Sequence, residues 1–203
     1  MLRVVTALLS ILLAVGSAHY GIVRIGYWID HTHFWYFAGA FVGLGILLAL
    51  VMKQSSFYST LRHEMCHWLF SVLFLHKPVG ISVSLQEGEY VYSGKSNYFI
   101  TLAPYFFPIV TFFLLLLRLL FDNPGPLFFI VIGLAMAFDL VSSIKDYHCG
   151  QSDWRRFGRP FSVIFSATML AFFTVLHFSI LFEGFSAVPK LFKHAFRFYA
   201  QFF

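Results

Sequence analysis

The sequence predicts an all-α polytopic membrane protein that forms one membrane-embedded domain over residues 1–203. Hydrophobic residues make up 59% of the chain and charged residues only 11%, whereas soluble domains carry about 25% charged residues. Apolar stretches near the length that crosses the hydrocarbon of a bilayer recur along the whole chain. The length leaves no room for a second substantial soluble domain. We therefore expect a multi-pass integral membrane protein of a bacterial inner membrane or an equivalent membrane.

Hydropathy predicts about six transmembrane helices, each built on roughly 20 mostly apolar residues. The first could instead be a cleaved signal peptide, because Gly16-Ser17-Ala18 resembles a small-residue cleavage site. The weak basic start at Arg3 favours a retained span. The expected spans cover residues 4–25, 34–52, 57–75, 98–121, 126–144 and 161–182.

The last segment, residues 188–203, is predicted to be an amphipathic helix on the membrane surface. Lys190, Lys193 and Arg197 recur at helical spacing between aromatic residues, a pattern typical of interfacial helices. The net charge of +5 suits contact with the anionic headgroups of the lipid bilayer and gives no reason to invoke nucleic acid. The 14 Lys and Arg residues divide evenly between the two sides of a six-span topology, so they do not predict its orientation.

Between the third and fourth expected spans the pattern changes to that of a short β-hairpin. Residues 79–84 alternate and are β-branched, residues 86–89 read as a turn, and residues 90–92 alternate again. A plain surface loop is the alternative reading. A hairpin here would lie next to the segment 57–75, and its edge strand could pair with an extended peptide.

That neighbouring segment contains the most informative motif of the chain, His63-Glu64-Met65-Cys66-His67. On a helix, positions i and i+4 share a face, so both imidazoles can bind one metal ion. Glu64 lies one step away, where it can take a proton from a water molecule at that metal. The pattern H-E-x-x-H is typical of zinc hydrolases. A chance cluster on a buried helix is the plain alternative, and ionisable groups at membrane depth favour function.

A catalytic zinc site normally has a third protein ligand, and Asp139 is the best candidate. It is the one carboxylate outside the motif that falls well inside an apolar span. If the spans alternate in direction, His63 and His67 lie roughly 10–16 Å deep and Asp139 roughly 20 Å deep, a gap that tilt can close. A carboxylate hydrogen-bonded to a neighbouring helix is the alternative. The next candidates for the ligand are Asp146, Asp153 and His148.

With these residues the chain resembles the site-2 protease family of intramembrane zinc metalloproteases. The resemblance covers residues 56–153 and rests on the motif, the hairpin and the proline-bearing segment 101–108. It implies that the two histidines and a later intramembrane aspartate bind Zn²⁺, with Glu64 as general base. It also implies substrates that are membrane-protein segments. The chain departs from the family pattern at Cys66, where glycine is usual, and it lacks the usual Asp-Gly motif.

We therefore expect an intramembrane zinc metalloprotease that hydrolyses peptide bonds in or near transmembrane segments of membrane proteins. Its expected catalytic residue is Glu64 and its expected metal ligands are His63, His67 and Asp139. Substrate selection would be intrinsic or supplied by a regulatory membrane partner. Two other functions stay open. The His/Glu/Asp cluster could serve a proton- or metal-handling transporter, or the chain could be a catalytically inactive membrane scaffold.

Overall fold

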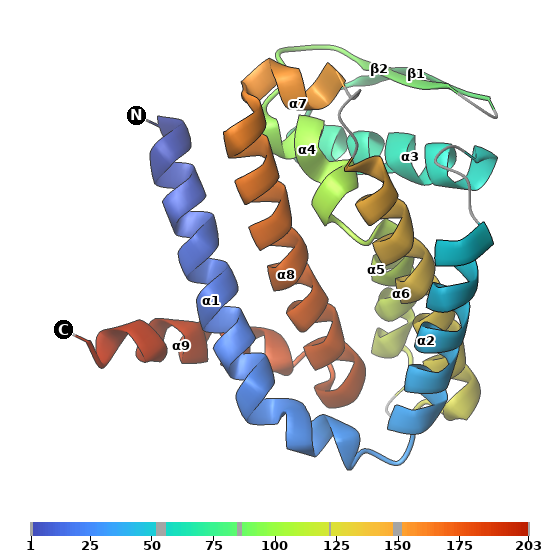
Figure 1. Ribbon diagram of the computed structural model, residues 1–203, viewed down its shortest axis with the longest axis vertical. Coiled ribbons are helices and arrows are strands. Elements are labelled where there is room, and N and C mark those ends of the chain that lie inside the picture. Colours follow the sequence, from blue (N-terminus) through green and yellow to red (C-terminus); the bar gives the residue numbers. More distant parts are fainter. Residues whose placement is uncertain (1, 52–55, 85–86, 122, 148–151, 203) are drawn as a thin grey trace.

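A computed structural model describes residues 2–51, 56–84, 87–121, 123–147 and 152–202 of the chain. The described part is mainly helical, with one two-stranded sheet (Figure 1). His148, one of the alternative ligands, lies outside the described residues. The elements in chain order are α1 (Leu2–Ile29), α2 (Phe34–Val51), α3 (Phe57–Leu73), β1 (Pro78–Val83), β2 (Gly88–Tyr92), α4 (Tyr98–Phe106), α5 (Ile109–Leu116), the short η1 (Leu117–Leu119), α6 (Pro126–Asp146), α7 (Ser152–Phe157), α8 (Arg159–Glu183) and α9 (Ala187–Ala200).

Four described helices, α1, α2, α6 and α8, are long and apolar enough to cross a membrane. They pack in two pairs, α1 against α8 and α2 against α6 (Figure 1). Large apolar side chains project outward from these helices, including Ile22 at 71% exposed and Leu50 at 80%. An exposed apolar surface of this extent suits lipid better than water. The four helices agree with the expected spans 4–25, 34–52, 126–144 and 161–182.

The expected span 98–121 is broken into two helices. The helices Tyr98–Phe106 and Ile109–Leu119 meet at a bend of 84°. They make a fifth candidate span only if the two helices together are counted as a single span. Pro108 precedes α5 and has no N–H to donate to the carbonyl of Pro104, four residues earlier. That carbonyl instead accepts hydrogen bonds from Arg62 Nη1 at 3.1 Å and from Ser143 Oγ at 3.2 Å. Side chains of α3 and α6 therefore supply the hydrogen bonds that the Pro104 carbonyl lacks at this break.

The motif helix α3 corrects the prediction of a third span at residues 57–75. It has 17 residues and is not among the described helices that could cross a membrane. It lies crosswise at the end of the bundle that also carries the hairpin and α7 (Figure 1). A capping box begins it: Ser56 Oγ accepts from the Ser59 backbone N–H, and Ser59 Oγ accepts from the Ser56 N–H. The capping box therefore sets the residue at which α3 begins.

The predicted β-hairpin is confirmed, and it lies over α3 (Figure 1). β1 and β2 pair antiparallel, with Ile81 opposite Tyr90 and Val83 opposite Gly88. Tyr90 fastens β2 to the motif helix, since its hydroxyl lies 2.7 Å from Ser71 Oγ. The alternating, β-branched pattern therefore predicted the strands, and their position directly after segment 57–75 predicted their place beside the motif.

The predicted C-terminal helix is also present, as α9. It crosses α1 and α8 (Figure 1) and buries Leu191 and Ala195. A Cβ added at Gly16 would lie 2.8 Å from the Ala195 Cβ, so the glycine allows the two helices this close approach. The opposite side of α9 exposes Phe196 and Arg197. Its position on a membrane surface stays a prediction.

Candidate metal centre

The two motif histidines share one face of α3, as the i, i+4 spacing predicts. Their rings are 5.0 Å apart, centroid to centroid, in an edge-to-face arrangement. Both are partly buried between α3 and the elements packed on it. Tyr105 of α4 packs edge-to-face against His63, with the ring centroids 5.5 Å apart. The helix therefore presents two imidazoles together in a sheltered position.

Asp153 of α7 completes a group of three side chains that can hold a metal ion. Its Oδ2 lies 3.5 Å from His63 Nε2 and 3.6 Å from His67 Nε2. Among the described residues, His63, His67 and Asp153 form the group whose ligand atoms could hold a metal ion, and these atoms all lie within 4.8 Å of one another. Ligands bound to tetrahedral zinc at 2.0–2.1 Å are separated by about 3.3–3.5 Å. The donor set of two imidazole nitrogens and one carboxylate oxygen is of a kind that Zn²⁺ accepts, and the two distances from Asp153 to the histidines are close to this separation.

The other ring nitrogens of the histidines are held by hydrogen-bond acceptors. His63 Nδ1 lies 3.2 Å from Asp146 Oδ2, and His67 Nδ1 lies 2.8 Å from the carbonyl oxygen of Ile100. When the ring is neutral, an acceptor at Nδ1 places its one proton on that nitrogen and leaves the Nε2 lone pair free for a metal. Both Nε2 atoms face Asp153. This pattern of orienting partners is typical of metal-binding histidines.

Asp146 is in turn held by Arg62. The guanidinium Nη2 donates to Asp146 Oδ2 at 2.7 Å, and both side chains are almost completely buried. On the other side of the site, the hydroxyl of Tyr105 donates to Asp153 Oδ2 at 3.1 Å. Each histidine and the aspartate therefore has a partner that fixes its orientation. Such supporting contacts commonly change metal affinity 10–100-fold when they are removed.

The structure does not bring Asp139 to the histidines, which corrects its prediction as the third ligand. Its carboxylate accepts hydrogen bonds from the backbone N–H and hydroxyl of Thr111, at 2.7 and 2.8 Å, and from the N–H of Val110 at 3.4 Å. These N–H groups belong to the first turn of α5, which Pro108 leaves without a side-chain cap. Asp139 therefore caps α5 from the neighbouring helix α6.

The error came from the depth argument. That argument assumed that the motif helix runs parallel to α6, whereas α3 crosses the end of the bundle (Figure 1). Both histidines therefore lie level with the C-terminal end of α6 and with α7, where Asp146 and Asp153 are found. In the sequence analysis, Asp146 and Asp153 are only the next candidates for the third ligand, after Asp139. The sequence signal that identifies them is position: each acidic residue borders the segment that links α6 to α7.

Glu64 is buried beneath the hairpin, with 6% of its surface exposed. A Cβ added at Gly88 of β2 would lie 2.8 Å from Glu64 Oε1 and 2.8 Å from its Cγ. Only a residue without a side chain lets the strand pass this close to the carboxylate. The glycine at the start of β2 therefore defines the space that Glu64 occupies.

Charges within the site act on each other strongly. Burial disfavours the charged form of His63, but its hydrogen bonds to Asp146 and Asp153 outweigh burial and raise its pKa to about 9. Burial would raise the pKa of Asp153, but its hydrogen bonds to both histidines hold that pKa well below its usual range. Burial raises the pKa of Glu64, although His63 and His67 oppose this effect. A raised pKa makes the Glu64 carboxylate a better proton acceptor.

Comparison of the chain with protein-family models, curated proteins and solved structures finds no match.

Proposed function

We propose that the chain is a zinc-dependent endopeptidase that hydrolyses peptide bonds of membrane proteins. The observation that carries the proposal is the convergence of His63 Nε2, His67 Nε2 and Asp153 Oδ2, with Glu64 beside them in the motif. The same arrangement supports membership of the site-2 protease family as part of the proposal. The third ligand in this proposal is Asp153 in place of Asp139.

Zinc held by these three residues would polarise the scissile carbonyl and lower the pKa of water bound to it. The protein's own contribution is to orient the ligands. Asp146 and the Ile100 carbonyl fix the two rings, and the Tyr105 hydroxyl fixes the Asp153 carboxylate. Three protein ligands leave a fourth position open, which distinguishes catalytic zinc sites from structural ones.

Glu64 is the proposed general base. It accepts a proton from the attacking water as the water oxygen bonds to the scissile carbon, and it passes that proton to the amine nitrogen as the carbon–nitrogen bond breaks. The second proton of the water also leaves the new carboxyl group for the amine, so the products are a carboxylate and a protonated amine and no other reactant is needed. Burial under β2 keeps bulk water from competing for the carboxylate.

The surroundings of the site support membrane-protein substrates. Apolar helices long enough to cross a bilayer form the rest of the bundle, and the site lies at their end beside α7 and the hairpin (Figure 1). A hairpin of two strands has open edges, and an extended peptide can pair with such an edge. The proposed cleavage position is therefore near a membrane boundary of the substrate, where a helical segment ends and its carbonyls become accessible.

The test compares wild type with Glu64→Gln for cleavage of a co-expressed membrane-anchored reporter. An amide cannot accept the proton, so we expect loss of cleavage with zinc content unchanged. Glu89→Gln, the same change at an exposed carboxylate of β2, is the matched control and should keep cleavage. Undiminished cleavage by Glu64→Gln would overturn the role of Glu64. Zinc binding without any cleavage by wild type, over a panel of membrane-anchored reporters, would favour a metal-handling function instead.

A further inference from the structure

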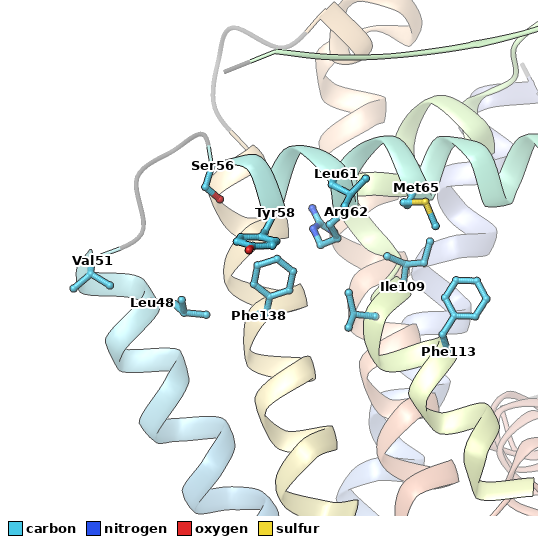
Figure 2. Close-up of a pocket in the computed structure, with 11 residues that line it drawn as sticks. Leu48, Val51, Ser56, Tyr58, Leu61, Arg62, Met65, Ile109, Phe113 and Phe138 are labelled. Atoms are coloured by element: carbon cyan, nitrogen blue, oxygen red, sulfur yellow. The ribbon is translucent and has the colours of Figure 1, made fainter. Parts of the chain in front are cut away.

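Helix α9 carries basic side chains that no carboxylate balances. Residues 187–203 contain no Asp or Glu, and their Lys and Arg residues, which we call the cationic edge, are all exposed: Lys190, Lys193 and Arg197. None of the three forms a salt bridge with a described residue. Arg62, in the wall of an apolar hollow of about 670 Å³ under α3 (Figure 2), differs, since it pairs with Asp146. Unbalanced positive charge on a surface favours an anionic partner.

The cations lie on one side of α9, and aromatic side chains lie on another. Members of the cationic edge follow one another at spacings of three and four, so they share a side of the helix. Phe192, Phe196 and Tyr199 follow at spacings of four and three and form a separate aromatic edge. Phe192 is 46% exposed and Phe196 is 76% exposed. Basic and aromatic edges on one helix are typical of helices that lie in the plane of a membrane interface.

The aromatic edge faces the apolar middle of the bundle. The Tyr199 hydroxyl donates to the carbonyl of Leu12 in α1 at 2.7 Å. The Phe192 ring packs on Phe172, midway along α8, with the ring centroids 5.8 Å apart. The first half of α1 projects apolar side chains outward, including Leu8 at 56% exposed. The aromatic edge therefore continues the apolar surface that suits lipid.

The cationic edge faces the end of the bundle where α1 and α8 finish. His194 lies on this edge, three residues before Arg197. Its Nε2 lies 2.8 Å from Nδ1 of His19 in α1. Farther along α1, Arg24 forms a salt bridge of 3.0 Å with Glu183, the last residue of α8. Because ionisable groups are costly inside the hydrocarbon, this end of the bundle suits the polar boundary of a bilayer.

A bilayer surface fits both edges at once. The phosphates of its headgroups accept hydrogen bonds from Lys and Arg, and its acyl chains take up exposed phenylalanine rings. An acidic protein surface or a nucleic acid offers negative charge without hydrocarbon beside it. The exposed apolar surface of α1 already suits lipid, so the bilayer is also the partner that lies next to α9.

We propose that α9 binds the surface of a bilayer that contains anionic phospholipids, with their phosphates at the cationic edge and their acyl chains against Phe192 and Phe196. Helix α9 follows the end of α8 that is remote from α7 (Figure 1). Because α8 has 25 residues and is about 37 Å long, its two ends reach opposite faces of a hydrocarbon layer about 30 Å thick. The metal centre beside α7 therefore lies near the other membrane face. Lipid binding by α9 does not depend on the proposed peptidase activity.

The first experiment measures hydrogen exchange of the full-length protein in lipid nanodiscs. Discs of phosphatidylcholine alone are compared with discs that also contain phosphatidylglycerol. We expect the amides of α9 to exchange at least about tenfold more slowly in the discs with phosphatidylglycerol, because each basic side chain near an anionic surface adds to the attraction. Equal exchange in the two kinds of disc, the result expected if the cations bind an acidic protein instead, would overturn the proposal.

Charge reversal locates the effect on α9. One variant reverses the whole cationic edge: Lys190→Glu, Lys193→Glu and Arg197→Glu. It should exchange α9 amides equally fast in the two kinds of disc. The matched control makes the same change in net charge at exposed arginines near the other end of α8: Arg155→Glu, Arg156→Glu and Arg159→Glu. This control should keep the difference in α9. Equal loss of the difference in both variants would assign the attraction to net charge and overturn the proposal.

The second experiment tests the direction of the two edges. Nitroxide labels are attached to Phe196→Cys and to Arg197→Cys, each in a Cys149→Ser background, whereas Cys66 is fully buried and stays unlabelled. Oxygen concentrates among acyl chains and a charged nickel complex stays in water, so their collisions with each label report its surroundings. We expect the label at position 196 to favour oxygen and the label at position 197 to favour nickel. The same preference at both positions would overturn the proposal.

Discussion

His63 and Asp146 meet at 3.2 Å, Nδ1 to Oδ2, and this contact turns the opposite nitrogen of the ring toward Asp153. The same oxygen of Asp146 accepts from Arg62. One buried carboxylate therefore orients His63, a proposed metal ligand, and also balances the charge of Arg62, the preceding residue of α3.

Asp146→Asn should weaken zinc binding about 10- to 100-fold, because the neutral amide oxygen accepts from Arg62 and His63 more weakly than the charged carboxylate does. Zinc affinity would be measured by competition with a chelator of known affinity. Asp30→Asn, at an exposed position between α1 and α2, is the control and should bind zinc as wild type does. Equal affinity in both variants would show that Asp146 does not orient His63.

Asp153→Ala and Asp139→Ala separate the two candidate third ligands. We expect Asp153→Ala to lose zinc. Asp139→Ala should retain zinc but lower the free energy of unfolding by about 1–2 kcal/mol, because the first turn of α5 loses its cap. Metal analysis and denaturant unfolding of each variant measure the two effects. Retention of zinc by Asp153→Ala together with its loss in Asp139→Ala would restore the original assignment.

Gly88→Ala should abolish most cleavage while zinc content stays unchanged. The new Cβ would lie within 3 Å of the Glu64 side chain and of Thr60 Cγ2, so the carboxylate must move. Gly80→Ala in the paired strand is the control, since a Cβ there has nothing within 4 Å. The readout is reporter cleavage normalised to zinc content. If both alanine variants cleave equally well, β2 does not position Glu64.

Zinc should stabilise the folded protein through the proposed centre. Free zinc at 100 times its dissociation constant adds about 2.7 kcal/mol to the free energy of unfolding when only the folded state binds it. The measurement is thermal unfolding of metal-stripped protein with and without added zinc. His67→Ala should abolish the increase, whereas His177→Ala, a change far along α8 from α7, should keep it. An equal increase in wild type and His67→Ala would place the zinc elsewhere.

The sequence predicted the four long helices, α9 and the hairpin because their signals are local. Long apolar runs and an alternating β-branched segment depend on near neighbours along the chain. The helical spacing of the motif likewise predicted that His63 and His67 would lie together. The direction of α3 across the bundle is set by tertiary packing, and hydropathy carries no information on it. For that reason Asp139 was wrongly preferred as the third ligand. Asp153, which lies in α7 a few residues after the end of α6, was only a later candidate.

The break between α4 and α5 has an effect beyond the bend itself. Proline at position 108 withholds one N–H, and the carbonyl of Pro104 is thereby free to accept from Arg62. Arg62 then holds Asp146, and Asp146 turns His63. A substitution that restored the missing N–H would let α4 continue and would compete for that carbonyl. The orientation of His63, a proposed metal ligand, thus depends on the N–H that Pro108 lacks, at a break between two helices that contribute no proposed ligand.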